Sequence, residues 1–322
     1  MGDPRALTEG VNARAHISLL LVIVVWAGSF SVIKQLLDDA VAAGDIAILR
    51  YAIAAPGFVC ILWRARGLPG LTRADATRVT AAGLLVVVGY HMFLNVGERY
   101  TTSGVAALVV ALAPGLTMAM AFALGLDRIS TRRVVGLVVA FTGVVIVVAL
   151  GSGSDLSFAS AKGPLIVLGA PIAFALYNVI LKPLLGRYDL LALTAATSLV
   201  GTVGLTPFVR GSTVDTVVAA TAAEAALLLY LGVLATLLGY IFWNTGLKGL
   251  GPTRAVTYAY AIPPLAVTFG AIFLDEPVTI WLAAGGALVV GGIALAQRPA
   301  GSVAARFAPW RRPPSEPSRS VS

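Results

Sequence analysis

Ten apolar segments, each about 20 residues long, follow one another along this chain with only short connectors between them. A helix of about that length crosses the hydrocarbon core of a bilayer, and helices satisfy their own backbone hydrogen bonds there. Charged residues make up 12% of the chain, against about 25% in soluble domains. The sequence therefore predicts an all-α integral membrane protein with ten transmembrane helices. The predicted spans are residues 17–37, 44–63, 79–99, 103–126, 133–151, 164–185, 189–210, 223–247, 253–274 and 278–297.

The second half of the chain repeats the first. Residues 244–276 echo residues 95–127 at a spacing of about 149 residues. A repeat of five spans must enter the membrane in the opposite direction the second time, so we expect two inverted five-helix repeats. The matched positions include Asn95 with Asn244, Ala106 with Ala255, Pro114 with Pro263, and Asp127 with Glu276. The predicted regions are an N-terminal segment (1–16), the two repeats (17–151 and 164–297) and a disordered basic tail (298–322).

Proline interrupts an apolar segment at the same depth in both repeats. Pro114 lies in the fourth span, and the pair Pro263 and Pro264 lies in the ninth. Proline lacks a backbone donor and clashes with the preceding turn, so these helices should break or kink, and the breaks could serve as hinges. Interrupted spans at matching places in two halves are a pointer to the binding site of a transporter.

Basic residues predict the orientation in the membrane. With both ends of the chain inside, eighteen lysines and arginines fall on the cytoplasmic side and four on the other. We therefore expect a multi-pass protein of the inner (plasma) membrane with both termini cytoplasmic. The first span could instead be a signal peptide, but Trp26 and Phe30 stand where a cleavage site needs small residues.

Polar side chains predict a central cavity that would bind substrate. His91, Asn95 and Glu98 share one face of the third span, and Tyr240, Trp243 and Asn244 share one face of the eighth. Because the repeat matches these faces, we interpret them as opposite walls of one cavity. The alternative is that the two asparagines only hydrogen-bond neighbouring helices.

Aromatic residues with a polar tip could complete this lining. Tyr258 and Tyr260 point to nearly opposite sides of their helix, so we expect at most one of them to face the cavity; an ordinary interfacial anchor is the alternative role of each. The other candidates are Trp26 and Ser29 in the first span, and Tyr177 and Asn178 in the sixth.

Arg50 is a guanidinium group inside the second span and needs an anion. A structural ion pair with Glu98 or Asp45 is the first interpretation, and a carboxylate or phosphate of the substrate is the alternative. For proton coupling the candidates are His91 and Glu98. The sequence has no phosphate-binding loop, which disfavours direct use of ATP.

Other function classes fit the composition poorly. The net charge of +8 comes from basic residues in connectors and the tail, which argues for topology rather than for a nucleic-acid partner. The alternative of a membrane-embedded enzyme of lipid or phosphate-ester chemistry would need clustered metal ligands or a nucleophile, whereas this chain has two histidines, His16 and His91, and one cysteine. We expect no metal, no cofactor and no enzyme activity. Cys60 is interpreted as a small buried hydrophobe. Glycines of the last span could serve internal packing or a homodimer: Gly285, Gly286, Gly291 and Gly292.

The chain resembles the EamA family of the drug/metabolite transporter superfamily over nearly all of residues 17–297. The resemblance is carried by Trp26 to Phe30, Leu49-Arg50-Tyr51, Thr101 to Leu108 leading to Pro114, and Gly246 to Glu276. It departs at Leu126-Asp127-Arg128, where such proteins commonly carry glycine and glutamate. The resemblance implies ten helices in two inverted repeats and transport of a small solute, often outward, such as an amino acid, another metabolite or a drug-like compound. Together with the repeat, it predicts a secondary transporter working by alternating access, with the lipid bilayer and a small molecule as its partners.

Overall fold

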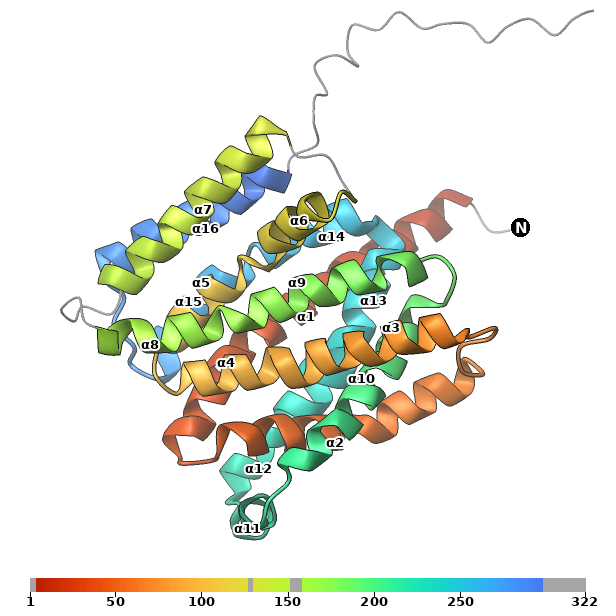
Figure 1. Ribbon diagram of the computed structural model, residues 1–322, viewed down its shortest axis with the longest axis horizontal. Helices are drawn as coiled ribbons and strands as arrows, with labels where there is room; N and C mark the ends of the chain where they lie inside the picture. The colour runs from red at the N-terminus through yellow and green to blue at the C-terminus, as the bar shows by residue number, and fades with distance from the viewer. Residues whose placement is uncertain (1–3, 127–129, 151–157, 298–322) are drawn as a thin grey trace, which may run out of the picture.

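The computed structural model describes residues 4–126, 130–150 and 158–297. Within these ranges the chain is helical, contains no strand, and provides ten helical stretches long and apolar enough to cross a membrane. Figure 1 shows them as a bundle in which α7 and α16 lie side by side at one edge. The single-helix spans are α1 (Pro4–Asp38), α2 (Ala43–Arg64), α7 (Thr131–Leu150), α10 (Leu190–Leu205) and α16 (Ile280–Gln297).

The other five spans are each built from two or three helical pieces. The third joins α3 (Arg73–Gly83), the π-helix η1 (Leu84–Gly89) and α4 (Tyr90–Glu98), and the fourth joins α5 (Ser103–Val110) and α6 (Ala113–Ala123). The sixth joins α8 (Phe158–Val167) and α9 (Gly169–Leu181), and the eighth joins α12 (Ala222–Leu229), the π-helix η4 (Tyr230–Leu238) and α13 (Gly239–Leu250). The ninth joins α14 (Pro252–Ala259) and α15 (Ile262–Phe273). Short 3₁₀ turns follow α9 (η2, Lys182–Leu184) and α10 (η3, Thr206–Phe208), and α11 (Gly211–Ala219) lies in a connector.

The third span begins earlier than hydropathy predicts, at Arg73 instead of residue 79. The hydroxyl of Thr72 accepts a hydrogen bond from the backbone N–H of Asp75 at 3.1 Å and caps the helix. An N-terminal cap satisfies backbone donors that would otherwise have no partner, so a polar first turn can extend an apolar helix.

The two helix breaks lie directly before the prolines. The fourth span is interrupted at Ala111 and Leu112 ahead of Pro114, and the ninth at Tyr260 and Ala261 ahead of Pro263. In both places proline occupies the first turn of the following helix, where its missing N–H costs no hydrogen bond.

The two π-helices are related by the same repeat. The span 84–89, moved by the repeat spacing, falls inside 230–238. A π-helix inserts a residue into the helical turn and leaves carbonyl groups without their usual partners, and it often lies at a functional site. Apolar sequence gave no signal for either one.

Glycines allow α7 and α16 to approach closely. A Cβ atom added at Gly143 would lie 2.6 Å from the carbonyl oxygen of Gly285, and one at Gly136 would lie 2.5 Å from that of Gly292. These two contacts are copies of each other under the repeat. Gly285 and Gly292 therefore serve packing within the chain, whereas no atom lies within 4 Å of a Cβ at Gly291. A homodimer stays a prediction.

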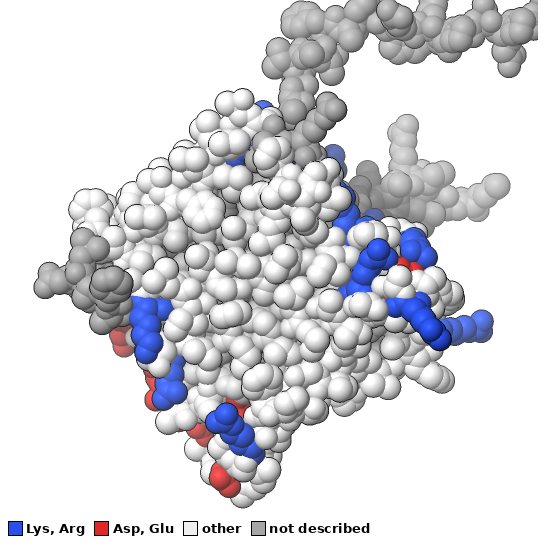
Figure 2. Space-filling view, viewed as in Figure 1, with Lys and Arg blue, Asp and Glu red and all other residues white. Residues whose placement is uncertain are grey.

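Charged side chains gather at the ends of the bundle (Figure 2), and a broad uncharged surface separates them on the face shown. At one end the carboxylate of Asp75 pairs with Arg187 at 3.0 Å and with Arg78 at 3.2 Å. At the other end Glu276 accepts a hydrogen bond from the backbone N–H of Ser103 at 2.7 Å and from its hydroxyl at 2.8 Å. The Asp75–Arg187 pair and the Ser103–Glu276 hydrogen bonds join the first repeat to the second.

Cys60 corrects one expectation. It was predicted to be buried, but it is exposed on α2. An apolar run in a membrane helix can face lipid as well as the core, because lipid is as apolar as the core, so hydropathy alone does not say which face is buried. Asp127, which the repeat matches with Glu276, and the tail 298–322 lie outside the described residues.

Candidate functional site

Arg50 lies in the middle of the bundle and is 7% exposed. Its Nε donates a hydrogen bond of 2.5 Å to the hydroxyl oxygen of Thr236 in η4. The Thr236 hydroxyl in turn donates to the carbonyl of Leu231, five residues back, at 2.8 Å. Because its proton is committed to that carbonyl, the hydroxyl is fixed as an acceptor for Arg50.

The predicted ion pair of Arg50 is wrong. Neither Asp45 nor Glu98 lies within the 4.0 Å that defines a salt bridge among the described residues. The carboxylate of Asp45 instead accepts hydrogen bonds from Thr213 at 2.6 Å and Thr216 at 3.4 Å, across to α11. Both carboxylates lie nearer the ends of their helices than Arg50 does. Each residue along a helix changes the depth in the bundle by about 1.5 Å, so Arg50 lies at a different depth from both carboxylates.

Tyr51 and His91 meet beside Arg50. The Tyr51 hydroxyl and His91 Nε2 are 3.0 Å apart, and their rings stand edge to face at 5.1 Å between centroids. His91 is 4% exposed, and its Nδ1 has no hydrogen-bond partner. Tyr90 also packs edge to face with the imidazole, at 4.9 Å between centroids.

A second group of rings adjoins this pair from α1 and α13. Trp26 lies 6.2 Å from Tyr240 and 5.4 Å from Trp243, and Phe58 lies 6.2 Å from Tyr240. Tyr240 packs in one hydrophobic cluster with Tyr51 and Phe58, which connects the two groups. We call the set Trp26, Arg50, Tyr51, Tyr90, His91, Thr236, Tyr240 and Trp243 the central cluster.

The π-helix η4 positions two members of the central cluster. It places Thr236 against Arg50, and the carbonyl of Ala235 accepts a hydrogen bond of 2.9 Å from Trp26 Nε1. A Cβ atom at Gly239 would lie 2.7 Å from that indole nitrogen, so glycine gives the ring its space. The extra residue of the π-helix thus frees backbone groups and rotates side chains toward α1 and α2.

The two asparagines do not belong to the central cluster. Asn95 donates to the carbonyl of Ala43 at 3.0 Å, and Asn244 donates to the carbonyl of Tyr240 at 2.7 Å. The side-chain oxygen of each is buried without a partner. They lie toward opposite ends of the bundle, because each is close to the end of its own inverted span. Ser29 is also engaged locally, through a 2.7 Å hydrogen bond to the carbonyl of Trp26.

Of the remaining candidates, only Tyr177 reaches the aromatic rings. It packs on Phe174 at 5.6 Å, and Phe174 packs on Tyr90 at 6.0 Å. Asn178, on the next position of α9, points to Thr117 at 3.5 Å.

Tyr258 and Tyr260 point to opposite sides of their span. The hydroxyl of Tyr258 is hydrogen-bonded to His16 in α1, and that of Tyr260 donates to Gln297 in α16. Their hydroxyl groups join this span to α1 and α16, a packing role that differs from the cavity lining and the interfacial anchor predicted for them.

Glu98 is separate from the cluster. It is fully buried at the end of α4, and neither carboxyl oxygen has a hydrogen-bond partner. Lys34 is paired with Asp38 at 2.7 Å, so its charge is largely compensated.

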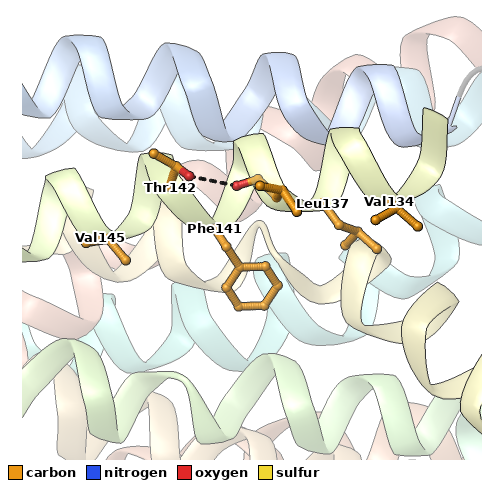
Figure 3. A pocket seen from close by; sticks show the side chains of 6 residues that line it. Val134, Leu137, Phe141, Thr142 and Val145 are labelled. Atoms are coloured by element: carbon orange, nitrogen blue, oxygen red, sulfur yellow. Dashed lines mark hydrogen bonds between the residues drawn. The ribbon is translucent and has the colours of Figure 1, made fainter. Parts of the chain in front are cut away.

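A shallow groove runs along the outside of α7 (Figure 3). It has a volume of about 470 Å³ and carries apolar side chains, with Thr142 as its one polar residue. The Thr142 hydroxyl donates to the carbonyl of Val138 at 2.9 Å and is thereby satisfied. A groove of this chemistry suits lipid chains, and the polar groups that could orient a solute lie in the central cluster instead. Its lining residues are Val134, Leu137, Val138, Phe141, Thr142 and Val145.

Sequence reasoning missed Tyr51, Tyr90 and Thr236. Tyr51 and Tyr90 directly adjoin residues that were selected, Arg50 and His91, and their position inside apolar segments was the available signal. Thr236 carried no such signal, because a lone threonine in a membrane helix usually bonds to its own helix.

Comparisons with known proteins agree with this architecture. A model described as the EamA-like transporter family matches residues 13–149 and again residues 161–297. An uncharacterized transporter of Archaeoglobus fulgidus is 32% identical over 88% of this chain and 98% of its own length. A solved structure with 20% identity covers 88% of this chain and 96% of its own, with a TM-score of 0.57, which supports the same fold.

Two further relatives are named as exporters. A probable terminal-alkyne amino-acid exporter of Streptantibioticus cattleyicolor is 30% identical over 89% of this chain and 94% of its own length. A probable amino-acid metabolite efflux pump of Salmonella typhimurium is 24% identical over 85% and 91%. With its ten apolar helices in two repeats, the chain belongs to the EamA-like transporter family and is a multi-pass membrane transporter rather than an enzyme.

Proposed function

We propose that this transporter exports a small organic solute across the inner membrane by alternating access, with both termini in the cytoplasm. The observation that carries the proposal is the central cluster, where a buried arginine and several aromatic rings meet between the two repeats. Aromatic rings supply apolar contact area, and their polar tips supply hydrogen bonds, which suits an amphipathic solute.

The direction and the kind of solute rest on the relatives. One is named an exporter of an amino acid and another an efflux pump for amino-acid metabolites. An amino acid or a similar metabolite fits the central cluster, because Arg50 can receive an acidic group and the rings can receive an apolar side chain.

The proline breaks are the proposed hinges. Each break interrupts the helix in the residues directly before Pro114 or Pro263. Broken helices at matched positions let each half bend in the same way, and alternating access exchanges the bent and straight forms between the halves.

Glu98 is the proposed proton carrier. Its carboxyl group is fully buried and has no hydrogen-bond partner for either oxygen. Such a group can bind and release a proton as its surroundings change between two conformations. His91 is the alternative carrier, but its Nε2 is already engaged with Tyr51.

Efflux from loaded cells tests the proposal. Cells that make the wild-type protein should lose at least one labelled amino acid or related metabolite faster than cells without it. Tyr240→Phe removes a hydroxyl from the central cluster and should slow that efflux. Tyr258→Phe makes the same chemical change at a hydroxyl bonded to His16, outside the cluster, and is the matched control. Equal efflux by the two variants would place the site elsewhere, and uptake in place of loss would reverse the direction.

A further inference from the structure

Arg50 is a buried cation without a counter-ion among the described residues. It is 7% exposed, and its hydrogen bond to Thr236 uses Nε alone. Burying a charge that nothing compensates is unfavourable, and a protein retains such a charge where a ligand supplies the opposite one. We propose that the two terminal nitrogens of Arg50 bind the carboxylate of the transported solute. The inference rests on the proposed transport function and assigns the chemical group that the site recognises.

The hydrogen bond to Thr236 prepares the guanidinium for this role. The Thr236 hydroxyl accepts from Nε at 2.5 Å while it donates to Leu231. With Nε held, the two terminal nitrogens form the end-on fork of the guanidinium. That fork matches the two oxygens of a carboxylate with two parallel hydrogen bonds. The π-helix η4 therefore orients the two terminal nitrogens of Arg50.

The surroundings complete a site for one small acid. Tyr51 directly follows Arg50 in α2, and its hydroxyl lies 3.0 Å from His91 Nε2. Tyr90 packs on the ring of His91, and Tyr240 packs in one cluster with Tyr51. The ring of His91 adds a buried Nδ1 that has no protein partner. One guanidinium balances the single charge of a carboxylate, whereas a phosphate monoester carries a charge of about −1.5 to −2 at neutral pH. The aromatic rings of Trp26 and Tyr240 then lie beside the rest of the molecule.

Binding of matched acid and amide pairs tests the assignment. Purified full-length protein is mixed with 3-phenylpropanoate, 3-phenylpropanamide or 3-phenylpropyl phosphate, and the affinity is measured by the shift of the unfolding temperature. The wild type should bind the acid at least tenfold more tightly than the amide or the phosphate ester. Arg50→Lys keeps the charge but removes the fork and should weaken acid binding about 10- to 100-fold. Arg99→Lys makes the same change at an exposed position and should leave it unchanged.

A variant that misfolds is recognised by its loss of the cooperative unfolding transition. Thr236→Val then serves as a second variant, because it keeps Arg50 and removes the acceptor for Nε. It should weaken acid binding, and the ratio of its affinity for the acid to its affinity for the phosphate ester should be smaller than in the wild type. Equal binding of acid and amide, tighter binding of the phosphate ester, failure to bind any of the three, or full acid binding by Arg50→Lys overturns the inference. Export of neutral or cationic metabolites by the same protein would leave the proposed transport function standing while the carboxylate site fails.

Discussion

The contact between α7 and α16 permits a stability prediction with an internal control. Gly143 faces the backbone of the opposite helix, where an added Cβ atom would lie 2.6 Å from the carbonyl oxygen of Gly285 and 2.7 Å from the nitrogen of Val289. Ordinary contacts of a Cβ atom begin near 3.4 Å. Because the obstructing atoms are backbone, Gly143→Ala can be accommodated only if the two helices move apart.

Gly291→Ala is the matched control. Gly291 also lies within a helix of this pair, and a Cβ atom there meets no atom within 4 Å. Replacing a mid-helix glycine by alanine gains about 0.5–1 kcal/mol in both variants, so this gain cancels in the comparison. What remains is the overpacking at Gly143, which costs about 1–3 kcal/mol.

The two variants are purified in the same detergent and unfolded by heat or denaturant. Gly143→Ala should be less stable than Gly291→Ala by that overpacking energy, and Gly291→Ala should be no less stable than the wild type. Gly292→Ala tests the repeat, because its Cβ atom would lie 2.5 Å from the nitrogen of Ala140 and the cost should be similar. Equal stability of Gly143→Ala and Gly291→Ala would refute the close helix contact.

Three further predictions concern other parts of the chain. Glu98→Gln keeps the size of the side chain but cannot release a proton, so proteoliposomes containing it should lose the dependence of transport on an imposed pH gradient, with binding of solute retained. Glu276→Ala removes the acceptor for the backbone N–H of Ser103 and should lower unfolding stability by about 0.5–2 kcal/mol, as loss of a helix cap does. The hydrogen bond from Lys248 holds the pKa of Asp189 below its usual value of 3.8. The stabilisation is therefore complete above pH 3.8 and lost as pH falls through the folded pKa, so the stability deficit of Asp189→Ala measured at pH 7 should vanish in strong acid.

The fold could be predicted from the sequence because its signals are repeated and local. The length of each apolar segment gives the spans, and the odd number of spans in each repeat gives the inversion. Pro114 and Pro263 mark the helix breaks, since proline acts on its own backbone wherever the helix packs. The packing of the last span could not be predicted in the same way, because Gly285 and Gly291 look alike in sequence and differ only in what lies opposite them.

The candidate site was predicted only in part, because the sequence does not show what lies opposite a side chain. Trp26, His91 and Tyr240 were selected, and the structure brings them to one region through Tyr51. Asn95 and Asn244 carried the strongest sequence signal as a matched pair. The inversion that makes them a pair also sends them toward opposite ends of the bundle, where each bonds to a backbone carbonyl.

The pairing of Arg50 failed because sequence gives the depth of a residue along its span but not the direction in which it points. Asp45 and Glu98 lie nearer the ends of their helices than Arg50 does, Asp45 turns to α11, and Glu98 is buried apart. The partner that Arg50 does find, Thr236, depends on a π-helix that apolar sequence does not announce.

The backbone features of the repeat are duplicated, whereas Arg50 and Thr236 of the central cluster are not, and this difference bears on mechanism. The helix breaks and the π-helices each occur once in each half, and the glycine contact between α7 and α16 occurs twice across the two halves. Arg50 and Thr236 occur once: at a repeat spacing of 148 to 149 residues, Ser198 or Leu199 falls opposite Arg50, and Val88 or Val87 falls opposite Thr236. In the proposed alternating access, duplicated backbone features let the halves exchange conformations at little cost in free energy, because each half can adopt the form of the other. The proposed binding group between them is then presented to either side in turn. On this reasoning Val87→Thr, which makes the two π-helices more alike, should leave acid binding unchanged, whereas Thr236→Val should weaken it.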